Sequence, residues 1–228
     1  MRRLVTAVLT ASLALPAYAA SSGPATAGEA ATTSISAYAG VTTTSTTTRT
    51  IVAGDTVVVS GVFRVAGTET GDTVLDLWAK PYGEAWRRVA SDTTNSGGRA
   101  AVSRAPMRLT YYQWRFAGDA TRNAATSNTV TVKVATKVGL VLADSTIASG
   151  QRVVATGRTR PAKPGNTVVL WSHRPTGRTQ LASSTVRSDG TYRIRKVMRS
   201  GSYSLYVTVS AGGGNALGTS VHRTLSVR

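Results

Sequence analysis

Few side chains in this sequence could carry out catalysis. It contains two histidines, His173 and His222, and no cysteine, which excludes thiol nucleophiles and thiolate metal ligands. Neither histidine lies near a Gly-x-Ser-x-Gly segment, the turn that presents a nucleophilic serine in α/β-hydrolases. The ten carboxylates are scattered, without the spacing of a calcium-binding loop. The sequence therefore predicts a non-enzymatic protein with no catalytic residue, no metal site and no cofactor.

Basic side chains give the strongest binding signal. The chain carries 27 Lys and Arg against 10 Asp and Glu, a net charge of +17, and residues 135–228 hold 14 basic and 2 acidic side chains. Residues 32–134 are more balanced, with 11 basic and 7 acidic side chains. Such an excess attracts polyanions. The predicted polyanion-binding residues are Arg158, Arg160, Arg187, Arg193, Arg195 and Lys196.

Strand geometry supports this grouping. Two explanations of it stay open, a polyanion ligand and a coding preference for arginine. Strand alternation places Arg193 and Arg195 on one side and Ile194 on the other. Candidate ligands are teichoic acids, acidic capsule, lipid headgroups and extracellular DNA. No recognition helix, zinc finger or aromatic groove is present, so sequence-specific nucleic-acid binding is not expected. The competing explanation is that high-GC coding favours arginine without a ligand being involved, because Arg outnumbers Lys 22 to 5.

Tryptophans near the middle strands suggest a different ligand. Trp78 follows Leu77 and Trp171 follows Leu170, so if the leucines point inward both tryptophans lie on an outer face. Exposed aromatic rings can stack on sugars, and Trp86 would join them in a carbohydrate-binding site. Core packing, or cover by an arginine stem, is the alternative.

An internal duplication must position these residues. Residues 54–61 (GDTVVVSG) return as 150–157 (GQRVVATG), and 71–74 (GDTV) return as 165–168 (GNTV). The period of roughly 90–96 residues is that of a duplicated domain and exceeds the short periods of solenoid repeats. Each copy shows about seven short strands with turn signals between them and no helical periodicity. The sequence predicts an all-β protein of two tandem seven-stranded immunoglobulin-like β-sandwiches.

The strands expected in each copy follow alternation and glycine-rich breaks. In the first copy they are 34–38, 56–63, 73–80, 86–90, 100–104, 111–117 and 128–134. In the second copy they are 138–143, 152–158, 167–173, 180–184, 191–196, 202–209 and 219–227. Residues 42–50, which are mostly threonine, form an insertion that we expect to be a loop open to O-glycosylation. An edge strand is the alternative, because β-branched residues suit strands.

Tyrosines sharpen the sandwich prediction. Tyr112 precedes Trp114 by two residues and Tyr203 precedes Leu205 by two. A tyrosine near the start of the penultimate strand can bond its hydroxyl back to the chain at the corner between sheets. We therefore expect Tyr112 and Tyr203 to occupy equivalent places, with Trp114 and Leu205 in the two cores.

These motifs resemble a known group of domains. The residues that carry the resemblance are 54–61, 71–74, 83–86 (GEAW), 93–98 (TTNSGG), 112–119 (YQWRFAGD) and 127–130 (SNTV). They are similar to the tandem immunoglobulin-like (fibronectin-like) domains of secreted and surface proteins of high-GC Gram-positive bacteria. The resemblance covers nearly all of residues 32–134 and is weaker over 135–228. It implies a spacer, adhesion or binding role, with anionic cell-envelope polymers or another surface protein as partner.

The ends of the chain predict export. Residues 1–19 combine a short basic segment, an apolar run over 4–15 and an Ala-x-Ala site, as in a signal peptide. The run is too short for a membrane span, and no second apolar run follows. We expect a flexible tail over 20–33, the first domain over 32–134, the basic second domain over 135–228, and a protein that is secreted or held non-covalently at the cell wall.

Three functions are compatible with this sequence. The first is a secreted binding or adhesion protein whose second domain docks on anionic polymer. The second is a carbohydrate-binding module that uses Trp78, Trp86 and Trp171. The third is a secreted structural spacer. Salt separates the first two, because electrostatic docking weakens with ionic strength.

Overall fold

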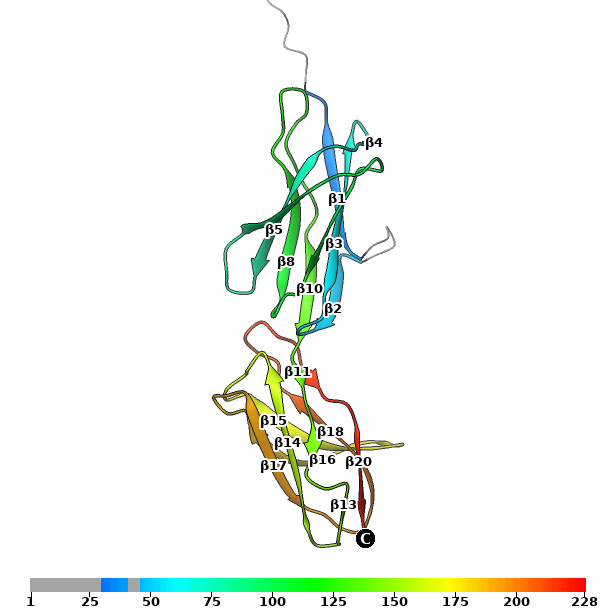
Figure 1. The fold of residues 1–228 in the computed structure, drawn as a ribbon, viewed down its shortest axis with the longest axis vertical. Helices are drawn as coiled ribbons and strands as arrows, with labels where there is room; N and C mark the ends of the chain where they lie inside the picture. Colours follow the sequence, from blue (N-terminus) through cyan, green and yellow to red (C-terminus); the bar gives the residue numbers. More distant parts are fainter. Residues whose placement is uncertain (1–29, 41–45) are drawn as a thin grey trace, which may run out of the picture.

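Two β-sandwiches follow one another along the chain in the computed structural model (Figure 1). The structure describes residues 30–40 and 46–228. Strands β1 to β10 build the first domain and β11 to β20 the second, and each domain has two sheets. The domains lie end to end, with the C-terminus at the end far from the first domain. The predicted signal peptide over 1–19 lies outside the described residues, as do 20–29 of the predicted tail.

The first domain places one strand, β3, at the centre of its smaller sheet. That sheet has the order β1-β3-β4, with β7 also paired to β3, and the larger sheet has the order β2-β10-β8-β5-β6, with β9 paired to β8. Nearly all pairs are antiparallel; β2 runs parallel to β10. The strands are β1 (Thr33–Ala39), β2 (Thr48–Val52), β3 (Val57–Val65), β4 (Thr68–Glu69), β5 (Val74–Pro81), β6 (Arg87–Thr93), β7 (Arg99–Arg104), β8 (Thr110–Phe116), β9 (Ala125–Thr126) and β10 (Val130–Ala135).

The second domain repeats this arrangement. Its sheets have the orders β11-β14-β12, with β17 paired to β14, and β13-β20-β18-β15-β16, with β19 paired to β18. Strand β13 again runs parallel to the last strand, β20. The strands are β11 (Lys137–Val138), β12 (Val141–Leu142), β13 (Thr146–Ile147), β14 (Arg152–Arg160), β15 (Thr167–Arg174), β16 (Gly177–Thr185), β17 (Thr191–Val197), β18 (Gly201–Val209), β19 (Gly218–Thr219) and β20 (Arg223–Val227).

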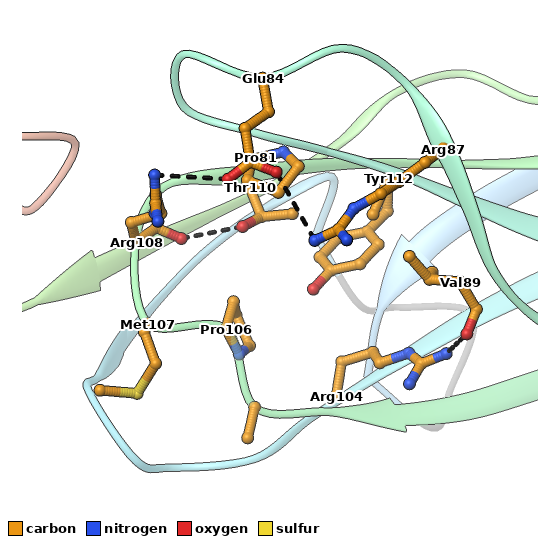
Figure 2. Close-up of a pocket in the computed structure, with 12 residues that line it drawn as sticks. Pro81, Glu84, Arg87, Val89, Arg104, Pro106, Met107, Arg108, Thr110 and Tyr112 are labelled. Carbon is orange, nitrogen blue, oxygen red and sulfur yellow. Dashed lines mark hydrogen bonds and ion pairs between the residues drawn. The ribbon is translucent and has the colours of Figure 1, made fainter.

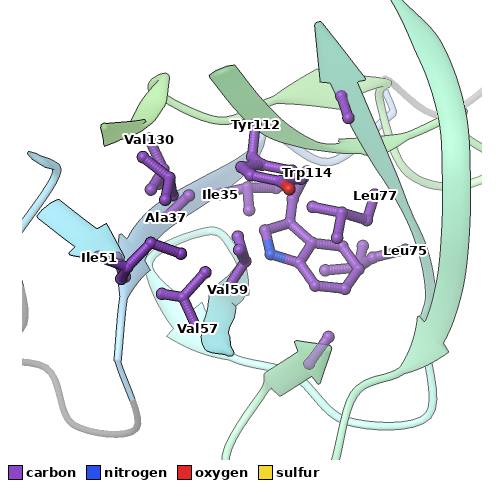
Figure 3. Close-up of a cluster of buried hydrophobic side chains, with 14 of the residues drawn as sticks. Ile35, Ala37, Ile51, Val57, Val59, Leu75, Leu77, Tyr112, Trp114 and Val130 are labelled. Atoms are coloured by element: carbon purple, nitrogen blue, oxygen red, sulfur yellow. The ribbon is translucent and has the colours of Figure 1, made fainter. Parts of the chain in front are cut away.

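Each sandwich encloses its own apolar core. In the first, Trp114 is fully buried and packs among aliphatic side chains of both sheets, including Val59, Leu75 and Leu77 (Figure 3). In the second, Leu205 is fully buried in a separate core. Both residues therefore lie in the cores, as predicted. Because neither domain has a cysteine, apolar burial rather than a disulfide holds the two sheets together.

The fourteen expected strands are present, and two of them are interrupted. The segment 138–143 divides into β11 and β12, and the segment 219–227 divides between β19 and β20. The prediction of a loop over 42–50 is wrong at its C-terminal end, because Thr48–Thr50 belong to β2 and pair with Thr131–Lys133 of β10. Strand β2 lies at one edge of the larger sheet, beside β10, and its β-branched residues suit a strand. Residues 42–45 lie outside the described part of the chain.

The predicted equivalence of Tyr112 and Tyr203 is also wrong. Leu77 of β5 pairs with Trp114, and its repeat, Leu170 of β15, pairs with Val207. The repeat offset on this strand is thus 93 residues, which makes Leu205 the counterpart of Tyr112. Motif similarity aligns Tyr112 with Tyr203. The strand pairing instead gives an alignment two residues away from that one.

A tyrosine corner consequently exists in one domain. The Tyr203 hydroxyl donates to the Arg199 carbonyl at 3.0 Å, the expected bond back to the chain. Tyr112 lies two residues further along its strand, and the carbonyl four residues before it, that of Arg108, accepts the Thr110 hydroxyl instead at 2.9 Å. Tyr112 is left with its hydroxyl facing a cavity.

One loop of the second domain fixes the contact with the first. We call residues 211–217, between β18 and β19, the joint loop. The Leu109 N–H donates to the Gly214 carbonyl at 2.7 Å. The Asn215 side-chain amide donates to the carbonyls of Met107 at 2.8 Å and Val134 at 3.2 Å. The joint loop therefore holds the 105–109 connection of the first domain.

Candidate functional site

The predicted basic residues gather on β14, β17 and the turn between β16 and β17. Arg193 and Arg195 are exposed, whereas Ile194 between them is buried. Arg193 pairs with Thr156 of β14, and Arg158 pairs with Thr191, so Arg158 lies diagonally beside Arg193 on the same face. We call Arg152, Arg158, Arg160, Arg193 and Arg195 the basic face. All five are exposed.

The two other predicted basic residues occupy different positions. Lys196 lies on the same side of β17 as Ile194, away from Arg195, by strand alternation. Arg187 begins the turn that leads into β17, where its N–H donates to the Thr191 carbonyl at 2.8 Å. Arg187 and Arg158 both lie near Asp189. The pKa of Asp189 is lowered, first by the Thr191 backbone and side-chain hydrogen bonds and then by these two charges.

Carboxylate partners are missing from the basic face. Each of the five ion pairs within 4.0 Å among the described residues joins two side chains of the first domain. The second domain has 14 basic residues and only Asp144 and Asp189 to oppose them. One carboxylate oxygen of Asp189 accepts hydrogen bonds from Thr191, from its N–H at 2.9 Å and from its hydroxyl at 2.7 Å. Apart from Arg158, which lies beside Asp189, the positive charges of this face are therefore available to solvent and ligands.

The outer-face tryptophans are partly covered by arginine. Leu77 and Leu170 are fully buried, and Trp78 and Trp171, one residue later, are half-buried on the opposite face. The Arg115 guanidinium lies 4.5 Å from the centre of the Trp78 ring and 5.5 Å from that of Trp86. These are cation–π distances, and they place an arginine over the surface that a sugar ring would need.

The second domain repeats this cover with a different residue. The Arg178 guanidinium lies 4.5 Å from the centre of the Trp171 ring, and the Trp171 indole N–H donates to the Thr208 hydroxyl at 2.8 Å. Cation–π packing on both domains accounts for the outward tryptophans without a glycan.

The histidines meet on one exposed face of the second domain. The Ser204 hydroxyl lies 2.9 Å from His222 Nδ1. The His222 ring stacks on Tyr206, with centroids 4.7 Å apart, and meets the edge of His173 at 5.4 Å. Neither histidine forms an ion pair with a carboxylate among the residues described, so the third member of a catalytic triad is missing there.

Two carboxylates, those of Asp119 and Asp189, stabilise turns. One Asp119 oxygen accepts from the N–H groups of Thr121 and Arg122, and the other from the Arg122 side chain at 2.7 Å. These bonds, the Arg122 side chain first, lower the pKa of Asp119 to about 2. Over residues 30–40 and 46–228, no three His, Asp or Glu side chains gather as a metal site would require.

A cavity in the first domain brings together residues that the sequence analysis did not propose as a site. We call it the Arg104 pocket; its volume is about 310 Å³. Figure 2 shows the Tyr112 hydroxyl pointing into the space between Pro106 and Arg104. The pocket is lined by Ala79, Pro81, Glu84, Arg87, Val89, Arg104, Ala105, Pro106, Met107, Arg108, Thr110 and Tyr112. They come from the β5–β6 hairpin and from the β7–β8 connection, so no local motif could have revealed the pocket.

Charge and burial distinguish this pocket from the rest of the first domain. Three arginines and one glutamate line it. Glu84 lies 3.5 Å from the Arg87 guanidinium and 3.4 Å from that of Arg108. Arg104 donates to the Val89 carbonyl, and its Nε is buried without a hydrogen-bond partner. Burial raises the pKa of Tyr112 to about 12, although the Arg104 charge and a hydrogen bond with Thr110 oppose this.

Comparisons with known proteins return structural neighbours only. No protein-family model matches the chain, and no curated protein sequence is significantly similar to it. Among solved structures, a tetra-tandem repeat from the extending region of a large adhesion protein shares 17% identity at a TM-score of 0.36, over 86% of this chain and 49% of that one. This chain thus spans about half of that neighbour.

Two further neighbours come from intimin. The D0-D1 domain of intimin shares 10% identity at a TM-score of 0.29, over 85% of this chain and 97% of that one. A C-terminal 282-residue fragment of intimin, solved with the intimin-binding domain of the translocated intimin receptor, shares 12% identity at a TM-score of 0.37, over 78% and 60%. In the described part of this chain, no helix is long and apolar enough to cross a membrane.

Proposed function

We propose that this protein is a secreted, non-enzymatic binding or adhesion protein whose second domain docks electrostatically on an anionic polymer of the cell envelope or extracellular space. The observation that carries the proposal is the basic face, which has five exposed arginines on adjacent strands and no carboxylate partner among the described residues. A row of unneutralised cations binds a polyanion by releasing its counterions.

Geometry favours this role over glycan stacking. The basic face is exposed along its whole length, whereas Trp78 and Trp171 are half-buried and each lies against an arginine. A sugar would have to displace Arg115 or Arg178 before it could stack. The proposal assigns the docking residues to Arg158, Arg160, Arg193 and Arg195, with Arg187 at the end of the row.

The test is co-sedimentation of the protein with teichoic-acid-containing cell wall at low and high salt. We expect binding that weakens by more than about tenfold between roughly 50 and 200 mM salt, and that falls similarly when Arg193→Gln and Arg195→Gln are combined. The matched control combines Arg49→Gln with Lys80→Gln, two exposed cations of the first domain. Binding that persists at high salt, or that the control weakens equally, would rule out docking through the basic face.

A further inference from the structure

The Arg104 pocket contains a cation that the protein does not neutralise. No carboxylate among the described residues lies within 4.0 Å of Arg104. Its Nη2 donates to the Val89 carbonyl, and its buried Nε has no acceptor. A buried, unsatisfied charged donor is unfavourable, so an acceptor bound at this arginine would relieve that cost.

A second donor faces the same space. Tyr112 is 3% exposed, and its hydroxyl points into the pocket (Figure 2). A tyrosine hydroxyl is protonated at neutral pH, and burial, which raises the pKa of Tyr112 to about 12, keeps it so. A hydroxyl hydrogen rotates to suit its acceptor, so Tyr112 can donate to a ligand beside Arg104.

The lining suits a carboxylate. An arginine fork matches the two oxygens of a carboxylate, and Glu84 already bridges Arg87 and Arg108 at the rim. This bridge leaves Arg104 as the arginine of the lining without an ion pair among the described residues. The walls formed by Val89, Pro106 and Met107 are apolar and suit the CH face of a ring.

Pocket size limits the ligand to one small unit. A volume of about 310 Å³ lies at the lower end of the range for small-molecule sites, roughly 300–1,000 Å³. The outer wall is also held in place from the second domain, since Asn215 binds the Met107 carbonyl and Gly214 binds the Leu109 N–H. A wall fixed before binding lowers the entropic cost of taking up a ligand.

We propose that the Arg104 pocket binds the carboxylate of a uronate, a sugar ring that carries one acid group, with Arg104 and Tyr112 as donors and Pro106 and Met107 against the ring. The pocket lies in the first domain, whereas the basic face lies in the second. The proposal therefore stands apart from polymer docking, and the two can fail separately.

The experiment is a titration of the full-length protein with sodium glucuronate, followed by NMR, with glucose as the neutral probe. Glucuronate should shift resonances of the pocket residues saturably, and glucose should not. Arg104→Gln should weaken glucuronate binding about tenfold and Tyr112→Phe roughly threefold. The matched controls are Arg49→Gln, which removes the same charge from β2, and Tyr111→Phe, which removes a hydroxyl from the preceding residue of β8; both should bind like the parent.

Each outcome bears on the pocket directly. Equal shifts with glucose, or equal weakening by Arg49→Gln, would overturn the proposal, as would loss of glucuronate binding in the combined Arg193→Gln and Arg195→Gln variant. Retained glucuronate binding in that variant supports the pocket even if cell-wall docking is lost. Titration of the combined Arg193→Gln and Arg195→Gln variant with tetragalacturonate identifies the source without a contribution from the basic face: tighter binding than galacturonate indicates a unit of a polymer, and equal binding indicates the free acid.

Discussion

At the scale of single residues, two repeated glycines mark the close approach of an aromatic ring. A Cβ on Gly61 would lie 2.7 Å from the Trp114 ring, and one on Gly157 would meet the Gly139 carbonyl first and lie 2.7 Å from the Tyr192 ring. These glycines end the duplicated motifs 54–61 and 150–157. The ring comes from β8 in one domain and from β17 in the other. Both copies thus need glycine at this position because a ring packs against its backbone, but the ring comes from a different strand in each copy.

Adding a methyl group at Gly61 should therefore be costly. Gly61→Ala forces the buried Trp114 ring to move, and overpacking of this kind typically costs about 1–3 kcal/mol. Urea unfolding followed by tryptophan fluorescence measures the change in the free energy of unfolding. Gly97→Ala is the matched control, because its new Cβ would have 3.4 Å to the nearest atom, and it should change stability by less than about 0.5 kcal/mol. Equal effects of the two substitutions would contradict this explanation.

At the scale of strands, a buried serine stabilises the penultimate strand of each domain. The Trp114 N–H donates to Ser127 Oγ at 2.9 Å, and the Val207 N–H donates to Ser220 Oγ at the same distance. Each serine hydroxyl then donates to the carbonyl of the next residue, at 2.8 and 2.9 Å. The separation of Ser127 and Ser220 by 93 residues matches the offset of the strand pairs, so the serines identify the true repeat alignment.

Removing this hydroxyl should destabilise the first domain. Ser127→Ala leaves the buried Trp114 N–H without its acceptor, and a buried donor left unsatisfied costs about 1–3 kcal/mol. Ser103→Ala, at an exposed position of β7, is the comparison and should be nearly neutral. Amide hydrogen exchange provides the specific readout: the Trp114 amide should exchange faster in Ser127→Ala, and unchanged protection there would refute the role of the serine.

Strand positions could be predicted because alternation and turn residues are local properties of the sequence. Strand β2 is expected only as the alternative to a loop, because its threonines show no apolar alternation and its partner, β10, lies about 80 residues away. The shifted equivalence of Tyr112 has a similar origin, since motif similarity competes with a strand register that only pairing reveals. Outward Arg193 and Trp78 followed from alternation, whereas the Arg104 pocket required two connections to meet in space.

At the scale of the whole molecule, the two domains differ in charge and are joined by specific contacts. Lys163 binds the joint loop: its ammonium donates to the Gly212 carbonyl at 3.0 Å. Burial, and then the charge of Arg108 from the other domain, lower the pKa of Lys163. Gly214 lies against the Tyr82 ring. A Cβ added to Gly214 would lie 2.9 Å from Cδ1 of that ring. Such contacts predict a fixed orientation of the basic face relative to the Arg104 pocket.

Asn215 is a side chain of the joint loop that donates hydrogen bonds to the first domain. It is 6% exposed, and its amide joins the two domains by donating to Met107 and Val134. Asn215→Ala removes both bonds and leaves two carbonyls without that donor, so the domains should reorient more freely. Residual dipolar couplings measure this directly: the two domains of the parent should share one alignment tensor, and those of Asn215→Ala should not.

The same substitution should reach the pocket, because the bond to Met107 holds its outer wall. Glucuronate binding in Asn215→Ala should weaken by about two- to fivefold, as expected for the loss of one neutral hydrogen bond that preorganises a site. Gln180→Ala, which removes an exposed amide from β16, is the control and should change neither the tensors nor the affinity. A shared alignment tensor in Asn215→Ala would show that the backbone contacts alone fix the domains, and unchanged affinity would show that the pocket wall forms without the second domain.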